Sequence, residues 1–456
     1  MVSFFIALFL LLQIFGLSML GSVSILIFVY YLLEFIRKTN ECIALREFIM
    51  LLFTLNYLFS PALMYLGLEK YQYYGMKIDQ QAYFTLALPS VFLLHKGLYI
   101  YRTGIFYPNL RMYKMNASVN EEHIKWWVIG GIVLSYLSGF LPSDLGFFAY
   151  LLSSIRYVGA FSMLILDINK YKYHMLGVLA YEMSRSLIHG MFHDFVIWIV
   201  FLFLLVAYIY KPSVKQKVVA LVFGALFIFV LQLTKGEYRS RLVSEEAIGI
   251  GTFAASVTAI NEKNKEGIFT KENVASSLTR ANQAWIFAST VNNMDKTKDF
   301  QSFSLLGIYA EAAFLPRIIA PNKLKAGDRT LFNRFSGKFL SDSTSMGLGL
   351  LADGYISFGT IGVWAFALVF GLLFSLIFRI VEYWTNTSAM FAFFFFPLLN
   401  YAVRPDCGTQ TIMGHVVKGV IVFTGITVFY NWYGRDKFEY VKSVAYKRGI
   451  PAFNVS

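Results

Sequence analysis

The chain has 456 residues, of which 57% are hydrophobic and only 15% are charged, and its formal net charge is +13. A soluble globular chain would carry roughly a quarter charged residues, so the composition excludes that class. In a membrane protein a basic excess usually lies in cytoplasmic loops, so the charge requires no nucleic-acid partner. The two cysteines, Cys42 and Cys407, imply no disulfide framework and have no metal-binding spacing.

Apolar runs near 20 residues recur along the chain, and each can cross about 30 Å of hydrocarbon as a helix. Backbone polar groups in lipid must be satisfied within the segment, so these runs predict helices. We therefore predict an all-α polytopic membrane protein with about eleven transmembrane helices, at 2–35, 48–67, 82–101, 124–141, 146–166, 173–189, 194–210, 217–234, 354–379, 387–403 and 415–433. The first run is long for one helix, and we expect it to tilt or to break near Gly16 and Gly21. A hairpin there would give twelve helices.

The distribution of charge predicts the orientation. One set of alternate loops, with the tail and adjoining helix edges, holds 17 Lys and Arg, whereas the short loops on the other side hold 3. The positive-inside rule places the first set in the cytoplasm. We expect four parts: a bundle of eight helices over 1–234, a partly helical periplasmic loop domain over 235–353, three helices over 354–433, and a basic cytoplasmic tail over 434–456. Within the loop, 273–290 and 303–314 have apolar residues near helical spacing.

Ionisable residues inside predicted helices indicate either a packing lock or the wall of a cavity, because a charge in hydrocarbon costs several kcal/mol. Glu182, Arg185, His189 and His193 share one face by their spacing of three or four residues. Arg156 could belong to either arrangement. No glutamate lies between the two histidines, so we expect no zinc site there. His415 and Lys418 lie one turn apart at the outer end of the last helix.

Arginines recur where the outer loop meets the membrane, and guanidinium groups suit bidentate binding of phosphate oxygens. Any single one could equally be a solvated or headgroup-facing side chain. The candidates are Arg239, Arg241, Arg280, Arg317, Lys323 and Arg404.

Three short stretches resemble bacterial oligosaccharide repeat-unit polymerases of the Wzy type, which include the polymerases of O-antigen and of enterobacterial common antigen. The first is Leu278-Thr279-Arg280 with Trp285. The second is the run from Phe314 to Lys323, which contains Pro316 and Pro321, followed by the Gly/aromatic run from Asp353 through Tyr355 to Gly362. The third is Arg404 at the end of the penultimate helix. The chain departs from the family at 189–193, where relatives often carry a Gly-Ser/Thr-Arg turn. Arg185 or a histidine could supply the positive charge there.

The resemblance implies a metal-independent glycosyltransferase of the bacterial inner membrane that needs no cofactor. It would transfer a growing glycan from undecaprenyl pyrophosphate to a hydroxyl of the next lipid-linked repeat unit at the periplasmic face. Arg280 and Arg404 would stabilise the pyrophosphate leaving group, and Arg185, Arg239, Arg241, Arg317, Lys323, Tyr355 and His415 would bind substrate. A base would assist. The residue types offer His189, His193, Glu311, Asp353, Asp406 and His415 without ranking them.

Three other functions stay open. An O-antigen ligase would use the same chemistry on a different acceptor. A flippase or other transporter of lipid-linked sugars usually shows two similar halves, and no such symmetry occurs in this sequence. A structural subunit of an envelope complex would have no chemistry of its own. Beyond lipid-linked oligosaccharides and the bilayer, a chain-length regulator is a partner that the polymerase function would allow.

Overall fold

The computed structural model describes residues 2–68, 72–244, 249–264, 267–315, 319–325, 327–340, 346–404 and 407–433. Within these ranges the chain is helical and has no β-strand. Seven helical stretches are long and apolar enough to span a membrane: Met19–Lys38, Leu45–Tyr65, Leu145–Leu166, His193–Tyr210, Val214–Val243, Leu350–Trp384 and Thr409–Tyr433. The protein is therefore an all-α membrane protein by length and composition of its helices.

The first apolar run forms two helices. Helix α1 (Val2–Ile14) ends before Gly16, which has a φ of 90°, and α2 (Met19–Lys38) begins after the N-cap Ser18. A left-handed glycine ends a helix without steric cost, so the predicted break near Gly16 is confirmed.

The other helices of the N-terminal half match most of the predicted runs. In chain order they are α3 (Leu45–Thr54), the π-helix η1 (Leu55–Phe59), α4 (Ser60–Tyr65), the 3₁₀-helix η2 (Gln72–Tyr74), α5 (Gln80–Leu98), α6 (Leu110–Val119), α7 (Glu121–Leu137), the 3₁₀-helix η3 (Ser138–Phe140), α8 (Ser143–Ser153), α9 (Ile155–Leu166), α10 (Ile168–His189), α11 (His193–Tyr210) and α12 (Val214–Val243). Helix α12 continues past the predicted end at 234, so Arg239 and Arg241 lie on its last turns.

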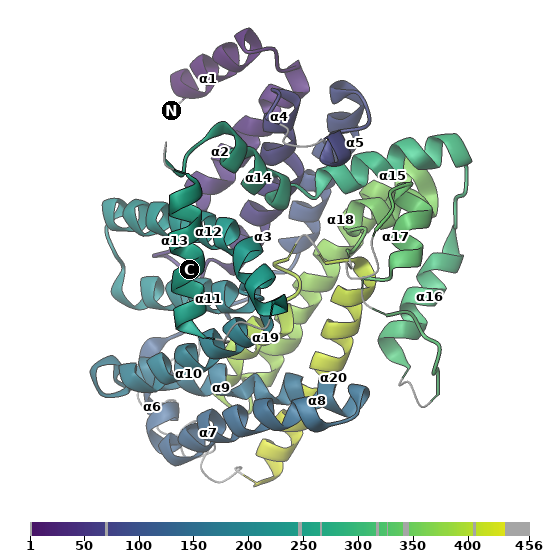
Figure 1. Ribbon diagram of the computed structural model, residues 1–456. Helices are drawn as coiled ribbons and strands as arrows, with labels where there is room; N and C mark the ends of the chain where they lie inside the picture. The colour runs from purple at the N-terminus through teal and green to yellow at the C-terminus, as the bar shows by residue number, and fades with distance from the viewer. Residues whose placement is uncertain are drawn as a thin grey trace.

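In the predicted outer segment the described residues form five helices, α13 to α17, and these pack on the long apolar ones. Helices α13 (Ile250–Lys263) and α14 (Lys271–Ala281) contact α12, while α15 (Ala284–Thr297) contacts α17 (Arg329–Ser336) and α18 (Leu350–Trp384). Helix α16 (Phe303–Phe314), which coincides with the predicted 303–314, contacts α20 (Thr409–Tyr433). Figure 1 shows α15, α16 and α17 together on one flank of the molecule, and α13 and α14 beside α12.

The segment predicted as a helix over 387–403 is different. It forms a 3₁₀-helix, η4 (Ala389–Phe394), and a five-residue helix, α19 (Phe395–Leu399), and every residue of both is buried. A run that is apolar on all sides suits a site enclosed by protein as well as it suits lipid, and the sequence pattern does not separate the two. The predicted helix over 387–403 was therefore wrong in length, because the observed helical segment ends at Leu399 and consists of two short helices.

Helices α5 and α18 cross in close contact because glycines face each other. A Cβ on Gly97 would lie 2.6 Å from the Leu368 carbonyl oxygen, and one on Gly371 would lie 2.5 Å from that of Leu94. Small residues let membrane helices approach closely and pack their backbones together. This crossing forms the centre of the bundle.

The Gly/aromatic run bends α18 sharply. Phe358 and Gly359 leave helical geometry, with a φ of 60° at Gly359, and a Cβ on Gly362 would lie 2.0 Å from the Gly354 carbonyl oxygen. The first two turns of α18 thus fold back against the rest of the helix, which requires glycine at the contact. The bend places Asp353 in the interior of the bundle.

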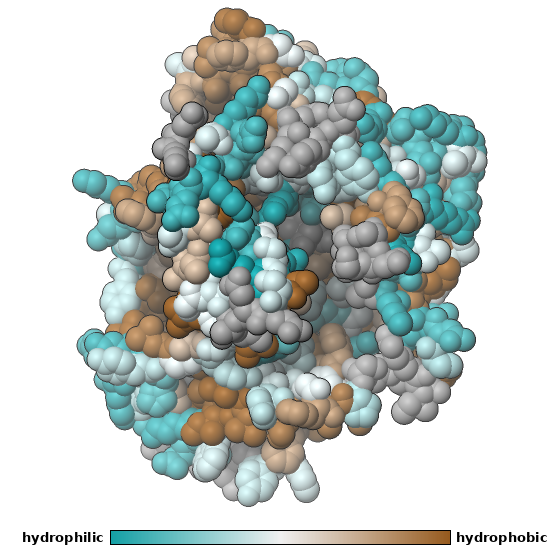
Figure 2. Space-filling view, viewed as in Figure 1, coloured by the Kyte–Doolittle hydropathy of each residue, from teal (hydrophilic) through white to brown (hydrophobic). Residues whose placement is uncertain are grey.

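Contacts between distant loops define one end of the bundle. Three pairs of loops that were predicted to share one side are joined by hydrogen bonds: Asn40 donates to the Pro212 carbonyl (2.7 Å), the Gly104 N–H to Glu382 (2.6 Å) and Lys170 to Glu121 (3.0 Å). Helices between these loops expose large apolar side chains, such as Trp126, Phe223 and Val222. Figure 2 shows apolar patches on the surface and a hollow near the middle of the visible face, where hydrophilic side chains gather.

Candidate functional site

The turn between α10 and α11 lies at the end of the bundle opposite the hydrogen-bonded loops described above, and polar side chains gather around it. Gly190 ends α10 in a left-handed conformation, with a φ of 60°. Two residues near the end of α12 hold this turn: Tyr238 donates to the Leu187 carbonyl (2.9 Å) and Arg239 Nε donates to the Gly190 carbonyl (3.0 Å). The turn therefore fixes the position of the Arg239 guanidinium.

Arg239 and Arg280 form a pair of neighbouring cations. Arg280, at the end of α14, donates to the Gln232 carbonyl (2.5 Å) and to its side-chain oxygen (3.3 Å). The surrounding protein, and then the nearby charge of Arg239, lower the pKa of Arg280. Both side chains are exposed, and neither forms an ion pair with any residue that the structure describes. Two neighbouring guanidinium groups that lack an ion-pair partner among the described residues favour a polyvalent anion.

Arg404 forms a second charged centre on the other side of the turn. It is ion-paired with Asp194 in the first turn of α11 and donates to Asn400 (3.4 Å). Its guanidinium lies 4.5 Å from the centre of the Tyr401 ring, and the His415 ring lies 4.4 Å from the same ring. Arg404 is mostly buried, whereas the side chain of Asp194 keeps 30% of its surface exposed.

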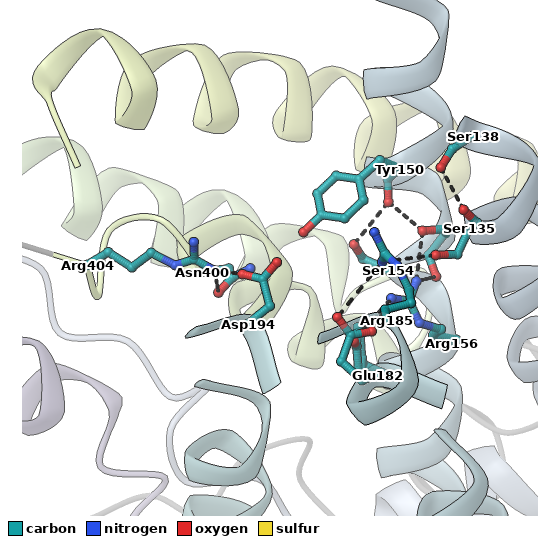
Figure 3. A network of polar contacts seen from close by, with 12 residues as sticks. Ser135, Ser138, Tyr150, Ser154, Arg156, Glu182, Arg185, Asp194, Asn400 and Arg404 are labelled. Carbon is teal, nitrogen blue, oxygen red and sulfur yellow. Dashed lines mark hydrogen bonds and ion pairs between the residues drawn. The ribbon is translucent and has the colours of Figure 1, made fainter. Parts of the chain in front are cut away.

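A third centre is buried between α7, α9 and α10. Arg156 is paired with Glu182 at 3.0 Å, and Arg185 lies 3.9 Å from the same carboxylate and donates to Ser135 (3.2 Å). Figure 3 shows this network and the Asp194–Arg404 pair in one view, with the hydroxyl of Tyr150 pointing toward the latter. Two cations share one carboxylate, so the partly exposed Arg185 carries the surplus charge.

The remaining predicted residues divide into exposed and buried groups. His189 and His193 are exposed at the α10–α11 turn, and His193 has an interaction partner. His415 is buried and donates from Nε2 to the Pro397 carbonyl (2.7 Å). Lys323 donates to the Leu315 carbonyl (2.6 Å), and Arg241 is paired with Glu237 at 3.3 Å. Arg317 and Asp406 lie outside the described residues.

Asp353 and Tyr355 hold helices together. The two carboxylate oxygens of Asp353 accept hydrogen bonds from the Tyr309 hydroxyl (2.7 Å) and the Thr409 N–H (3.1 Å), and the side chain is buried. Tyr355 donates to Asp295 (2.8 Å). A carboxylate enclosed in this way joins α16, α18 and α20 and has no access to a substrate, so the prediction that Asp353 acts as a base is not supported by its surroundings.

Asp194 is the site residue that the sequence reasoning missed. The only signal for it was an acidic residue in the first turn of a helix, next to His193, and that pattern is common because it suits the helix dipole. The described residues contain no group of three or more His, Cys, Asp or Glu that could hold a metal ion.

Comparison with known proteins assigns the chain to a family. The model of a family described as a domain of unknown function, DUF8712, matches residues 1–399, which include Arg185, Asp194, Arg239 and Arg280 and end before Arg404. No curated protein and no solved structure matches the chain. Because the family model covers most of its length, the protein belongs to the DUF8712 family.

Proposed function

We propose that this protein is a membrane glycosyltransferase that polymerises lipid-linked oligosaccharide repeat units at the periplasmic face of the bacterial inner membrane. The observation that carries the proposal is the gathering of Arg239 and Arg404 around one helix turn, with Arg280 beside Arg239. The three arginines come from α12, α14 and the loop before α20, so the fold brings together residues far apart in the chain.

A cluster of this kind suits the departure of a diphosphate. When an acceptor hydroxyl attacks the anomeric carbon, negative charge develops on the undecaprenyl diphosphate that leaves. Fixed guanidinium groups can stabilise that charge as it develops. Their planar forks bind phosphate oxygens in pairs, and they keep their charge at any pH relevant to a cell.

The surroundings of the cluster suit a lipid-borne substrate. Apolar helices flank the site, so an isoprenoid chain could remain in the bilayer while the diphosphate reaches the arginines. The basic loops, which we expect in the cytoplasm, lie at the other end of the bundle. The site would therefore face the compartment where repeat units are joined.

The test is reconstitution of the purified protein in lipid nanodiscs with a synthetic lipid-diphosphate-linked repeat unit. We expect a ladder of longer glycans from the wild type, and its loss in the Arg239→Ala, Arg280→Ala and Arg404→Ala variants. Arg334→Ala is the matched control. That exposed arginine is not part of the cluster, and it is paired with Asp299 at a distance of 2.8 Å. A full ladder from all three variants would contradict the proposal. If the glycan is transferred only to a lipid A core acceptor and not to another repeat unit, the protein is a ligase.

A further inference from the structure

Asp194 lies where a proton acceptor for the proposed reaction would be needed. It lies in the first turn of α11, beside the turn that holds Arg239, and it is ion-paired with Arg404. Its side chain is 30% exposed, in contrast with Asp353 and His415, which are buried. Among the described carboxylates, Asp194 is the one joined directly to an arginine of the cluster.

Arg404 is held independently of Asp194. Its guanidinium donates to Asn400 and lies against the Tyr401 ring, which is itself packed on His415. His415 is fixed in turn by the Pro397 carbonyl. Because these contacts remain when Asp194 moves away, Arg404 can exchange one anionic partner for another without losing its place. Its Nε atom is buried and has no hydrogen-bond partner within the described structure, so not all of its donors are engaged.

We propose that Asp194 is the general base of the reaction and that the substrate diphosphate releases it from Arg404. This inference rests on the proposed function. The Asp194 carboxylate neutralises Arg404 and is engaged in this ion pair. A diphosphate carries more negative charge than a carboxylate, so it displaces Asp194 from the guanidinium. The freed carboxylate then lies beside the bound donor, where the acceptor hydroxyl must arrive.

The step balances without any further reactant. The acceptor hydroxyl oxygen forms a bond to the anomeric carbon as the bond from that carbon to the diphosphate oxygen breaks. The hydroxyl proton passes to the Asp194 carboxylate, and the electron pair of the broken bond leaves with the diphosphate, which the arginines hold. Donor binding thereby activates the base, so the base is available only when the donor is present.

The Asp194→Asn variant separates this role from a structural one. The amide keeps the size of the side chain and removes its charge and basicity. We expect turnover to fall by about 10²–10⁴-fold, the usual contribution of a general base. We also expect inorganic pyrophosphate to bind about tenfold more tightly, because the competing negative charge is gone. Binding is measured by calorimetry on the protein in nanodiscs, and turnover by the ladder assay.

Two further variants complete the design. Asp194→Glu keeps the charge and should retain part of the turnover, so it serves if the amide variant does not fold. Asp299→Asn, which removes a carboxylate from an exposed ion pair with Arg334, should change neither measurement. If Asp194→Asn binds pyrophosphate more weakly and also has lower turnover, Asp194 only orients Arg404. If its turnover stays within threefold of the wild type, Asp194 is not the general base. Either result overturns the inference. If the wild type makes no ladder, the proposed function fails, but the pyrophosphate titration still tests the exchange at Arg404.

Discussion

Arg156 on α9 and Glu182 on α10 form an ion pair at 3.0 Å that is almost wholly buried, with 2% and 4% of their side-chain surfaces exposed. Arg156 also donates to the Ser153 carbonyl (2.9 Å) and lies over the Tyr157 ring at 4.4 Å. Breaking a buried pair by removing one partner leaves an uncompensated charge, which costs far more than the pair itself contributes.

We therefore expect the Glu182→Ala variant to lose about 3–5 kcal/mol of its free energy of unfolding. Two arginines, Arg156 and Arg185, would lose their shared carboxylate. The measurement is chemical unfolding in detergent micelles. Glu41→Ala is the control, because Glu41 pairs with Arg37 and Lys38 on the exposed surface, and its loss should cost at most about 1 kcal/mol. Equal losses in the two variants would contradict the buried pair.

A substitution of Gly97 tests the crossing of α5 and α18. The Cβ of Gly97→Ala would lie 2.6 Å from the Leu368 carbonyl oxygen and 2.7 Å from the Leu372 nitrogen, and backbone atoms cannot rotate away. We expect overpacking to destabilise the protein by about 1–3 kcal/mol or more, seen as a lower midpoint of thermal unfolding. Gly130→Ala, where nothing lies within 4 Å of the added carbon, should be neutral or slightly stabilising. If Gly97→Ala leaves the midpoint of thermal unfolding unchanged, α5 and α18 lie farther apart than described here.

Tyr309→Phe distinguishes a structural Asp353 from a catalytic one. The change removes the hydroxyl that donates to the buried carboxylate, and an unsatisfied buried acceptor costs about 1–3 kcal/mol. We expect lower stability and an unchanged turnover per folded molecule in the ladder assay. If stability stayed the same while turnover fell, Asp353 would be part of the reaction after all.

The Arg239–Arg280 pair predicts stabilisation by a polyvalent anion. Inorganic pyrophosphate at 100 times its Kd should raise the free energy of unfolding of the wild type by about 2.7 kcal/mol. The double variant Arg239→Ala/Arg280→Ala should lose most of this effect, measured relative to its own stability without anion, because both neighbouring cations are gone. Undiminished stabilisation in the double variant would place the anion elsewhere. Arg334→Ala serves as the control, because that arginine is paired with Asp299.

The sequence predicted those parts of the fold that depend on length, hydropathy and local backbone preference. The break at Gly16 was predicted from a glycine in a long apolar run, and the helix over 303–314 was predicted from the helical spacing of its apolar residues. It did not predict that 387–403 would be short and enclosed, because a uniformly apolar segment reads alike in lipid and in a protein interior. The back-folding of α18 at Gly359 was also missed, since it depends on the contact of Gly354 with Gly362.

The candidate site was predicted in part. Arginine chemistry pointed to Arg239, Arg280 and Arg404, and helical spacing pointed to Glu182 with Arg185. For Arg156 a packing lock and a cavity wall were both open, and its buried pair with Glu182 favours the packing lock. Partners that meet only in three dimensions could not be predicted: Asp194 reaches Arg404, and Tyr309 reaches Asp353, through packing between helices distant in the chain.

The most direct test is a cryo-electron microscopy structure of the protein in nanodiscs with a non-hydrolysable lipid diphosphate bound. We expect the diphosphate oxygens within hydrogen-bond distance of the guanidinium groups of Arg239, Arg280 and Arg404, and the Asp194 carboxylate turned away from Arg404. A diphosphate bound at another part of the molecule, with the Asp194–Arg404 pair intact, would contradict the account.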